Sequence, residues 1–293
     1  MPHFKHLPLA ARSGRARSQA GFTLIEAVIV IVLTGILAAI VSVFIVSPVQ
    51  NYLATAARAQ LVDQADTAMR RIARDLTLAL PNSARVTANG LSLELIPTTG
   101  AARYATQGAD PLQFGVLDTS FNLVGPGLDL GNSQQLVFYN LGPDVPDANA
   151  YADNSSAVTQ ATSNRRSASN GAGPATSISL NSLAALPVGL FAEPYRVYAV
   201  SAPVTYRCDL SAGVQTLRRY QNYGFMPNQP DPPSTGSSTV LATGVSACNF
   251  SYAPAAVAAR AALVTLKLTL SADTRSGTES VSLYHAIHID NLP

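Results

Sequence analysis

A long apolar segment near the N-terminus is the first strong pattern in the chain. Residues 27–57 contain no Asp, Glu, Lys, Arg or His. Residues 22–46 are long enough to span a bilayer as one helix, since about 20 apolar residues suffice. Four basic residues and no acidic residue precede the segment. The positive-inside rule therefore predicts a single-pass protein with a cytoplasmic N-terminus and an exported C-terminal part.

Pro48 follows this segment directly. Proline cannot donate a helical hydrogen bond, so we expect a kink or a local loosening of the helix there. A cleaved secretory signal is the alternative, because Ala54-Thr55-Ala56 offers a small-residue cleavage site. The apolar region of such signals is only about 7–15 residues, which fits the long segment less well.

Beyond Pro48 the apolar residues recur every three or four positions, as on one face of a helix. This face consists of Leu53, Ala57, Leu61, Ala65, Ala68, Ile72 and Leu76. On the side of the helix expected to face solvent, opposite charges four residues apart can form stabilising ion pairs. These pairs are Asp66/Arg70 and Arg71/Asp75. We expect an amphipathic helix over 47–80 that packs its alanine-rich face on a sheet, with a free-standing coiled coil as the alternative.

The remainder, residues 81–293, has the alternation and the turn signals of β structure. Residues 85–96 read as a hairpin with Asn89-Gly90 at its turn. Further predicted strands are 112–117, 135–141, 194–200, 203–208, 214–221, 239–243, 246–252, 261–271 and 279–290. Connectors rich in Gly, Pro and Ser are expected at 142–177 and 226–238, and Asp153 to Ala175 is expected to be a mobile surface loop. The predicted fold class is α+β, with a long N-terminal helix packed on an antiparallel β-sheet head domain.

Charge and cysteine content refine this picture. The net charge is +2, but without the four N-terminal basic residues the chain has 15 basic and 17 acidic residues, so no basic nucleic-acid surface is expected. Cys208 and Cys248 have no CxxC partner, which argues against a zinc site. In an exported chain they are expected to form one disulfide bond; two free thiols in a cytosolic protein are the alternative.

Glu26 is out of place in an apolar helix, because a carboxylate at bilayer depth costs about 2.5–3.5 kcal/mol. If the chain is cut between Gly21 and Phe22, Glu26 lies one helical turn from a new α-amino group. The carboxylate is then near the positive end of the helix dipole. It could also pair with the α-amino group of a neighbouring copy, so the charge makes sense as half of a pair.

This stretch resembles the processing site of type IV prepilins and type II secretion pseudopilins. The matching residues are Gly21, Phe22, Thr23, Leu24, Ile25 and Glu26. The resemblance implies that a prepilin peptidase cuts after Gly21 and methylates Phe22, and that Glu26 guides subunit docking. Many major pilins have a helix-kinking proline where this chain has Val43, so the position of the bend differs here.

The resemblance also implies a division of the chain. Residues 1–21 would be the leader peptide, 22–46 the transmembrane and filament-core helix, 47–80 the amphipathic helix, and 81–293 a periplasmic β-rich domain. The segments around Cys208 and Cys248, and the closing residues 285–293, are similar to MshO-type minor prepilins of mannose-sensitive haemagglutinin pilus systems. Such proteins resemble J-type minor pseudopilins.

The partners implied by the family are the prepilin peptidase, other pilins through their N-terminal helices, an inner-membrane assembly platform and membrane lipid. The location implied is the bacterial inner membrane and then a pilus or pseudopilus. Two alternatives stay open. One is a J-type minor pseudopilin of a type II secretion system, and the other is a membrane-anchored periplasmic binding or adhesion protein.

No enzyme constellation is recognisable in the sequence, and no cofactor or metal is expected. His285 and His288 would fall on opposite faces of a strand. Asp144, Asp147 and Asp153 match no calcium motif and are expected to be solvated. Arg207, Arg218 and Arg219 stand among the aromatic residues Tyr206, Tyr220, Tyr223 and Phe225. We expect these aromatics to face the core or a neighbouring subunit rather than nucleic acid.

Overall fold

A computed structural model describes residues 21–130, 134–254, 261–275 and 277–293. The chain divides into two compact units, Met1–Tyr52 and Leu53–Pro293. The elements are long helices followed by antiparallel strands, which confirms the α+β fold class.

The apolar segment is helical from Leu24 onward. Helix α1 covers Leu24–Val41, a π-helical stretch η1 covers Ser42–Val46, and α2 covers Ser47–Thr77. Within the described residues, this helical run is the single one that is long and apolar enough to cross a membrane. None of the α1 side chains is buried, as expected of a surface that lipid or other helices would cover.

In the second unit, α2 packs its small apolar face into the core. Leu61, Ala65, Ala68, Ile72 and Leu76 are buried as predicted. Because alanine keeps the helix backbone close to its neighbours, this face allows tight packing on sheets. The predicted face begins too early, since Leu53 is 48% exposed. The two predicted i, i+4 ion pairs form: Asp66/Arg70 is exposed, whereas in Arg71/Asp75 the aspartate is largely buried.

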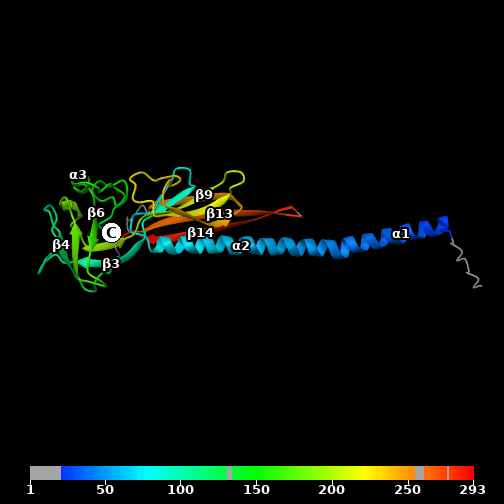
Figure 1. Cartoon of the computed structure of the whole chain (residues 1–293), viewed down its shortest axis with the longest axis horizontal. Helices are drawn as coiled ribbons and strands as arrows, with labels where there is room; N and C mark the ends of the chain where they lie inside the picture. Colours follow the sequence, from blue (N-terminus) through cyan, green and yellow to red (C-terminus); the bar gives the residue numbers. More distant parts are fainter. Residues whose placement is uncertain (1–20, 131–133, 255–260, 276) are drawn as a thin grey trace, which may run out of the picture. The chain divides into compact units, whose positions relative to one another are not determined.

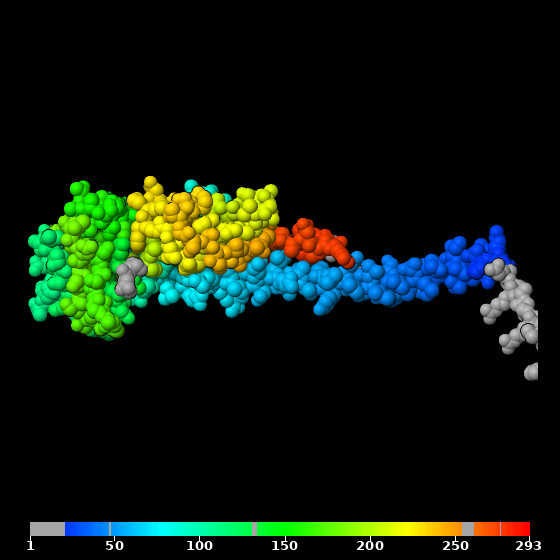
Figure 2. Space-filling view, in the orientation of Figure 1, coloured from blue at the N-terminus to red at the C-terminus, as the bar shows by residue number. Residues whose placement is uncertain are grey.

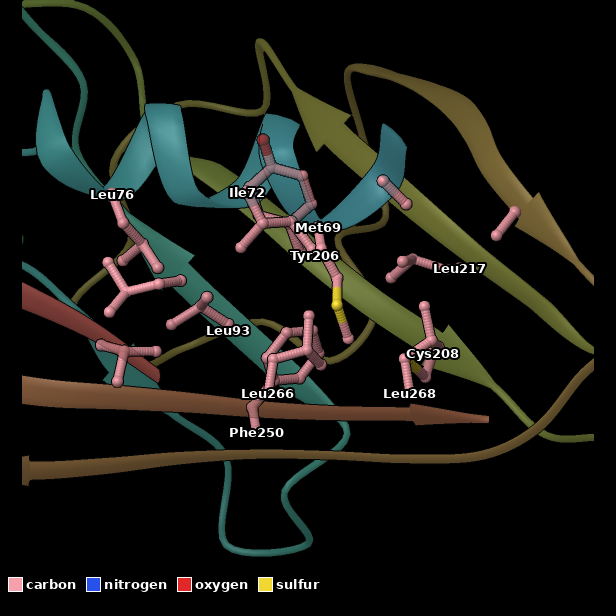
Figure 3. Packing of buried hydrophobic residues seen from close by; sticks show 14 of the residues in the cluster. Met69, Ile72, Leu76, Leu93, Tyr206, Cys208, Leu217, Phe250, Leu266 and Leu268 are labelled. Atoms are coloured by element: carbon pink, nitrogen blue, oxygen red, sulfur yellow. The ribbon is translucent and has the colours of Figure 1, made fainter. Parts of the chain in front are cut away.

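Two antiparallel sheets pack with α2 around one core. The first sheet has the order β1 (Arg85–Val86), β2 (Ser92–Leu95), β9 (Val204–Asp209), β10 (Thr216–Gln221) and β11 (Ser237–Thr243). The second has the order β12 (Val245–Pro254), β13 (Ala261–Thr274) and β14 (Gly277–Asp290). Figure 3 shows side chains of α2 meeting those of both sheets in this core.

The β13–β14 hairpin is longer than the sheet to which it belongs. The pairing of β12 with β13 begins at Val245 and Leu270, whereas β13 and β14 stay paired as far as Thr274 and Gly277. The hairpin therefore continues as a two-stranded ribbon beside α2 (Figure 2), where Glu279 pairs with Arg58.

A closed six-stranded barrel forms the other end of this unit (Figure 1). Around the barrel its strands are β3 (Thr98–Tyr104), β4 (Ser120–Val124), β7 (Ser177–Asn181), β6 (Arg165–Ser169), β5 (Gln135–Phe138) and β8 (Arg196–Val200). Two short helices lie in its loops, α3 (Ala157–Gln160) and the 3-10 turn η2 (Val188–Leu190). Its interior is filled by Phe121, Phe138 and neighbouring aliphatic residues.

The barrel is inserted between two neighbouring strands of the first sheet. Strands β2 and β9 pair antiparallel, with Leu95 opposite Val204. Everything from β3 to β8 lies between them in sequence. The barrel begins and ends at adjacent positions, because Thr98 of β3 pairs with Val200 of β8.

Two predictions in the barrel region are wrong. Residues 112–117 form no strand, and they fold as a loop in which Gly115 has a positive φ and Leu112 is buried. The expected surface loop from Asp153 to Ala175 contains α3 and the barrel strand β6. Its Ser- and Asn-rich composition concealed two buried arginines, Arg165 and Arg166.

Candidate functional site

The Gly21–Glu26 motif forms the start of α1. Thr23 is the N-cap residue, and its hydroxyl accepts a hydrogen bond from the Glu26 amide at 3.3 Å. The same hydroxyl donates to the Glu26 carboxylate at 3.5 Å. The Thr23 hydroxyl thus satisfies one backbone donor of the first turn, and Glu26 stands at the position that a capping box uses. The Thr-x-x-Glu pattern before an apolar run is a sequence signal for this cap that the sequence reasoning missed.

Glu26 has no ion-pair partner among the residues that the structure describes. Phe22 lies outside the helix, one residue before the cap. A free α-amino group on Phe22 would therefore lie within a turn of the carboxylate. This geometry accommodates the chemistry expected of the motif, a cut before Phe22 and a carboxylate left for a partner.

The helix departs from α geometry just before Pro48. The π-helical residues Ser42–Val46 precede it, and α2 begins at Ser47. A proline at position 48 leaves the carbonyl four residues earlier without its usual donor. Single π turns of this kind accommodate such interruptions. The predicted kink at Pro48 remains a prediction, and the structure places an irregular turn next to it.

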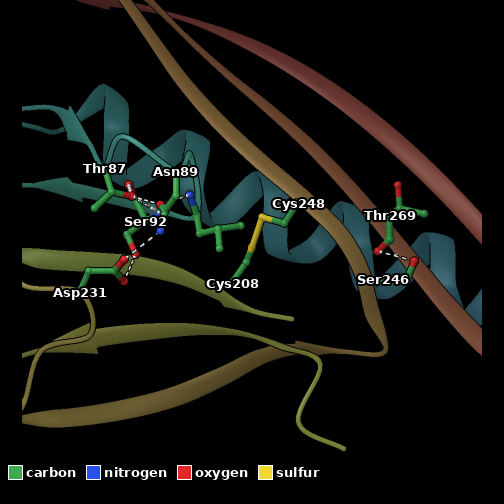
Figure 4. Close-up of a disulfide and its surroundings, with 9 residues drawn as sticks. Thr87, Asn89, Ser92, Cys208, Asp231, Ser246, Cys248 and Thr269 are labelled. Atoms are coloured by element: carbon green, nitrogen blue, oxygen red, sulfur yellow. Dashed lines mark hydrogen bonds between the residues drawn. A yellow bond between two sulfur atoms is a disulfide. The ribbon is translucent and has the colours of Figure 1, made fainter. Parts of the chain in front are cut away.

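In the β-rich part of the second unit, called the head from here on, Cys208 and Cys248 are joined by a disulfide bond with Cα atoms 6.3 Å apart. Cys208 belongs to β9 of the first sheet and Cys248 to β12 of the second, so the bond connects the two sheets (Figure 4). A backbone hydrogen bond of 2.7 Å from Phe250 to Gly90 connects the same two sheets at the β1–β2 turn.

Asp231 fixes the 226–238 connector onto the first sheet (Figure 4). Its carboxylate accepts hydrogen bonds from Ser92 at 2.6 Å, Arg207 at 2.7 Å and Asn89 at 3.3 Å. Desolvation alone would raise the pKa of Asp231, but these hydrogen bonds together lower it below its ordinary value. The Asp231 carboxylate therefore holds the connector on the first sheet through these hydrogen bonds.

The arginine and aromatic residues of β9 and β10 are engaged within the head. Tyr206 is buried and donates to Asp75 of α2 at 2.5 Å, and Arg219 pairs with the same carboxylate at 3.1 Å. Tyr223 is buried, and Phe225 packs beneath Arg165 at 3.8 Å. Tyr206, Tyr223 and Phe225 therefore face the interior, as predicted, whereas Tyr220 of β10 is only half-buried.

The other candidate residues are dispersed. His285 and His288 pair with Leu266 and Leu263 in β13, on opposite faces of β14 as predicted, and both are exposed. The Asp153 carboxylate caps Ser155 with bonds of 3.1 and 2.9 Å, which lowers its pKa. In the described part of the chain, no three His, Cys, Asp or Glu side chains are grouped as a metal site.

Comparison with known proteins addresses the N-terminal motif. Residues 16–42 match the family model of the prokaryotic N-terminal methylation motif. The chain carries a prepilin-type N-terminus. No curated protein and no solved structure gives a significant match. The prepilin-type N-terminus and the apolar helix support a membrane-anchored, single-pass protein of the type IV pilin and pseudopilin kind. Such a motif implies processing by a prepilin peptidase and assembly with other pilins.

Proposed function

We propose that this protein is a minor prepilin of a type IV pilus of the mannose-sensitive haemagglutinin type, acting in filament initiation or at the tip. Its role is structural. The peptidase cuts after Gly21 and methylates Phe22, the helix that follows enters the filament core, and the head lies on the periplasmic side before assembly. The observation that supports the prepilin part of the proposal is the methylation-motif match over residues 16–42. The assignment to this pilus type rests on the resemblance of the segments around Cys208 and Cys248 to MshO-type minor prepilins.

The geometry of the helix start supports the role of Glu26. Its carboxylate lies in the first turn of an apolar helix and has no basic partner among the described residues. A lone carboxylate in an apolar environment is costly unless it is paired. The methylated α-amino group of a neighbouring subunit is a cation of the right charge at the right depth.

Mass spectrometry of the N-terminal peptide from membrane-extracted protein tests the processing step. We expect a chain that begins at N-methylated Phe22. A chain that begins at Met1, or at Ala57 after a secretory signal, would contradict the proposal. The matched control is the same protein from cells that lack prepilin peptidase, which should retain its leader.

Substitution of Glu26 separates docking from processing. Glu26→Ala is expected to be cut and methylated normally but to lose piliation, because the partner ammonium then has no counter-charge. Glu26→Asp is the control that keeps the charge. Normal piliation by Glu26→Ala would refute the docking role.

The methylation motif is common to pilins and type II secretion pseudopilins. The phenotype of a deletion mutant therefore has to show in which of the two systems the protein works. Deletion of the gene is expected to abolish surface pili and to leave protein secretion intact. The reverse result would assign the chain to a type II secretion system as a J-type minor pseudopilin.

A further inference from the structure

The two open sheets of the head have their inner edges, β1 and β12, next to each other without pairing as neighbouring strands. A backbone hydrogen bond of 2.7 Å from the Phe250 amide to the Gly90 carbonyl connects these edges at one end. Beyond this bond a groove of about 720 Å³ separates them. We call it the edge groove, and Val86 of β1, Tyr252 of β12 and the barrel loop 141–145 border it. All of these residues belong to the second unit.

Hydrogen bonds also close the edge groove at the other end of β1. The Asn82 amide donates to the side-chain oxygen of Asn291 at 3.0 Å, and the Asn291 side chain donates to the Tyr252 hydroxyl at 3.1 Å. Asn291 is buried and therefore well held. The edge groove is thus a slot of limited length, and its two long walls are strand edges.

The backbone of β1 presents hydrogen-bonding groups to the edge groove. The Thr87 amide donates to Ser92 at 3.0 Å, so the backbone groups of Thr87 face β2. Successive residues of a strand direct their backbone groups to opposite sides. The amide and the carbonyl of Val86 therefore point away from β2 and toward the groove. They have no hydrogen-bond partner there among the described residues.

The same reasoning applies to β12. The Phe250 amide is used for Gly90, so the backbone groups of Phe250 face the edge groove and not β13. Those of Tyr252, two residues further on, face the same way. Apart from the Phe250 amide, none of these groups has a hydrogen-bond partner within the described ranges. Both long walls of the edge groove therefore offer free donors and acceptors.

The bottom of the edge groove belongs to the hydrophobic core of the head. Ala84 and Phe250 are buried there, whereas Val86 and Tyr252 pack against the core but are only partly buried. An added strand would cover this apolar surface, because every second side chain of a strand points to the same face.

One charged side chain at the edge groove has no partner. Asp144 of the barrel loop is exposed, and no described basic residue forms an ion pair with it. Arg85 also lines the groove, but it pairs with Glu94 at 2.6 Å. The uncompensated charge of the edge groove is therefore the Asp144 carboxylate, which favours a cationic ligand group.

An extended peptide matches all of these features. Its backbone has N–H donors and C=O acceptors on both sides, which is what two facing strand edges require. We propose that the edge groove binds an extended segment of a partner protein. Aliphatic or β-branched residues of that segment point to Val86 and Tyr252, and a Lys or Arg lies beside Asp144. Main-chain hydrogen bonds to β1 and β12 provide the affinity, as in other β-augmentation.

Fluorescence anisotropy on the purified full chain in detergent tests this inference. The probe is a labelled seven-residue peptide of alternating threonine and valine with a lysine at its centre, and we expect saturable binding. The inference goes beyond the proposed function and does not depend on it, because the edge groove contains no residue of the N-terminal motif. Failure of either one therefore leaves the other standing.

Backbone N-methylation of the probe shows whether both strand edges take part. One peptide is methylated at its odd residues and another at its even residues, so each loses the donors on one side. Each is expected to bind about tenfold or more weakly than the parent peptide, because several hydrogen bonds are lost on that side. A loss for one of the two peptides alone would mean that a single edge binds, and this would overturn the proposal.

A substitution of Asp144 provides a readout on the protein side. Asp144→Asn is expected to weaken binding of the lysine peptide about threefold, since one ion pair is lost. Binding of the same peptide with norleucine at its centre should not change. Asp147→Asn is the matched control, because Asp147 is an exposed carboxylate of the same loop region that does not line the groove. Equal effects of the two substitutions would contradict the placement of the peptide.

Two further results would overturn the proposal. Absence of saturable binding by the parent peptide would show that the edge groove accepts no strand. Self-association of the full chain that the parent peptide competes away would make a second copy the occupant, instead of a different protein. The intact Cys208–Cys248 disulfide in the mass spectrum checks the folding of each variant.

Discussion

The carboxylate of Glu94 is completely buried between the first sheet and the barrel. It accepts hydrogen bonds from Arg85 at 2.6 Å and from Tyr223 at 2.8 Å. Burial raises the pKa of Glu94 above its ordinary value of 4.5, and the bonds from Arg85 and Tyr223 offset part of this rise. The folded protein therefore binds a proton at Glu94 more tightly than the unfolded chain does. Its contribution to stability is complete below pH 4.5 and is lost as the pH rises through the folded-state pKa.

Substitution of Glu94 by glutamine tests the predicted direction of the pH dependence of stability. The difference in the free energy of unfolding between the parent and Glu94→Gln is expected to fall as the pH rises from 4 to 7, because only the parent titrates. Urea unfolding at a series of pH values measures it. Asp231→Asn is the control of opposite sign, since the pKa of Asp231 is lowered. There the difference should grow as the pH rises through the acid range, and equal slopes for both variants would contradict the argument.

At the same scale, Arg165 and Arg166 show where residue-by-residue reading fails. A pair of arginines in a Ser- and Asn-rich stretch predicts a solvated loop. Both are instead buried, and Arg166 donates to five backbone carbonyls, those of Ser163, Arg165, Gln160, Ala184 and Ala185. Burial lowers the pKa of each to about 10. Carbonyls delivered by distant loops leave no local signal in the sequence.

At the scale of elements, the periodicity of apolar residues predicted the strands that have one buried face and one open face. Strands β13 and β14 alternate apolar and polar residues because one face meets the core and the other is open. The strands β3, β4, β6 and β7 were not predicted. Strands β4 and β7 alternate buried and more exposed residues, but over only five positions each. Strands β3 and β6 consist mostly of Thr, Gly, Ala, Ser and Arg, which give no apolar alternation. At the helix start, the motif residues were identified from the sequence. The N-cap role of Thr23 was also predictable, from the Thr-x-x-Glu pattern.

The connection between β11 and β12 depends on Gly244. Its φ is +69°, and a Cβ atom there would overlap the carbonyl of Ser271, whose amide bonds to Gly244 at 2.7 Å. Gly244→Ala is expected to cost about 2–4 kcal/mol of unfolding free energy, combining backbone strain with this clash. Gly213→Ala is the matched control, because Gly213 has a φ of +81° and no atom within 4 Å of such a Cβ. Denaturant unfolding of both variants measures the difference, and equal losses would remove the clash from the explanation.

At the scale of the whole molecule, the disulfide connects two separate sheets, whose edges are also connected by the Phe250–Gly90 hydrogen bond. It joins β9 to β12 across the core and constrains the unfolded chain over a separation of 40 residues. The double variant Cys208→Ser/Cys248→Ser is expected to lose about 2–4 kcal/mol of unfolding free energy while keeping the fold. Thermal unfolding of the parent with and without reductant should reproduce the loss. A melting temperature unchanged in both experiments would show that the α2 core alone holds the sheets.

The inserted barrel has a consequence for how the head is built during folding. Strands β2 and β9 must meet although residues 95 and 204 are far apart in sequence, and closing so long a loop is slow. Once the barrel has closed, the pairing of Thr98 with Val200 already brings the flanking residues together. Leu95 and Val204 then meet as if a tight turn joined them. The closed barrel thus holds the ends of β2 and β9 next to each other. We therefore expect the surrounding sheet to assemble only after the barrel is complete.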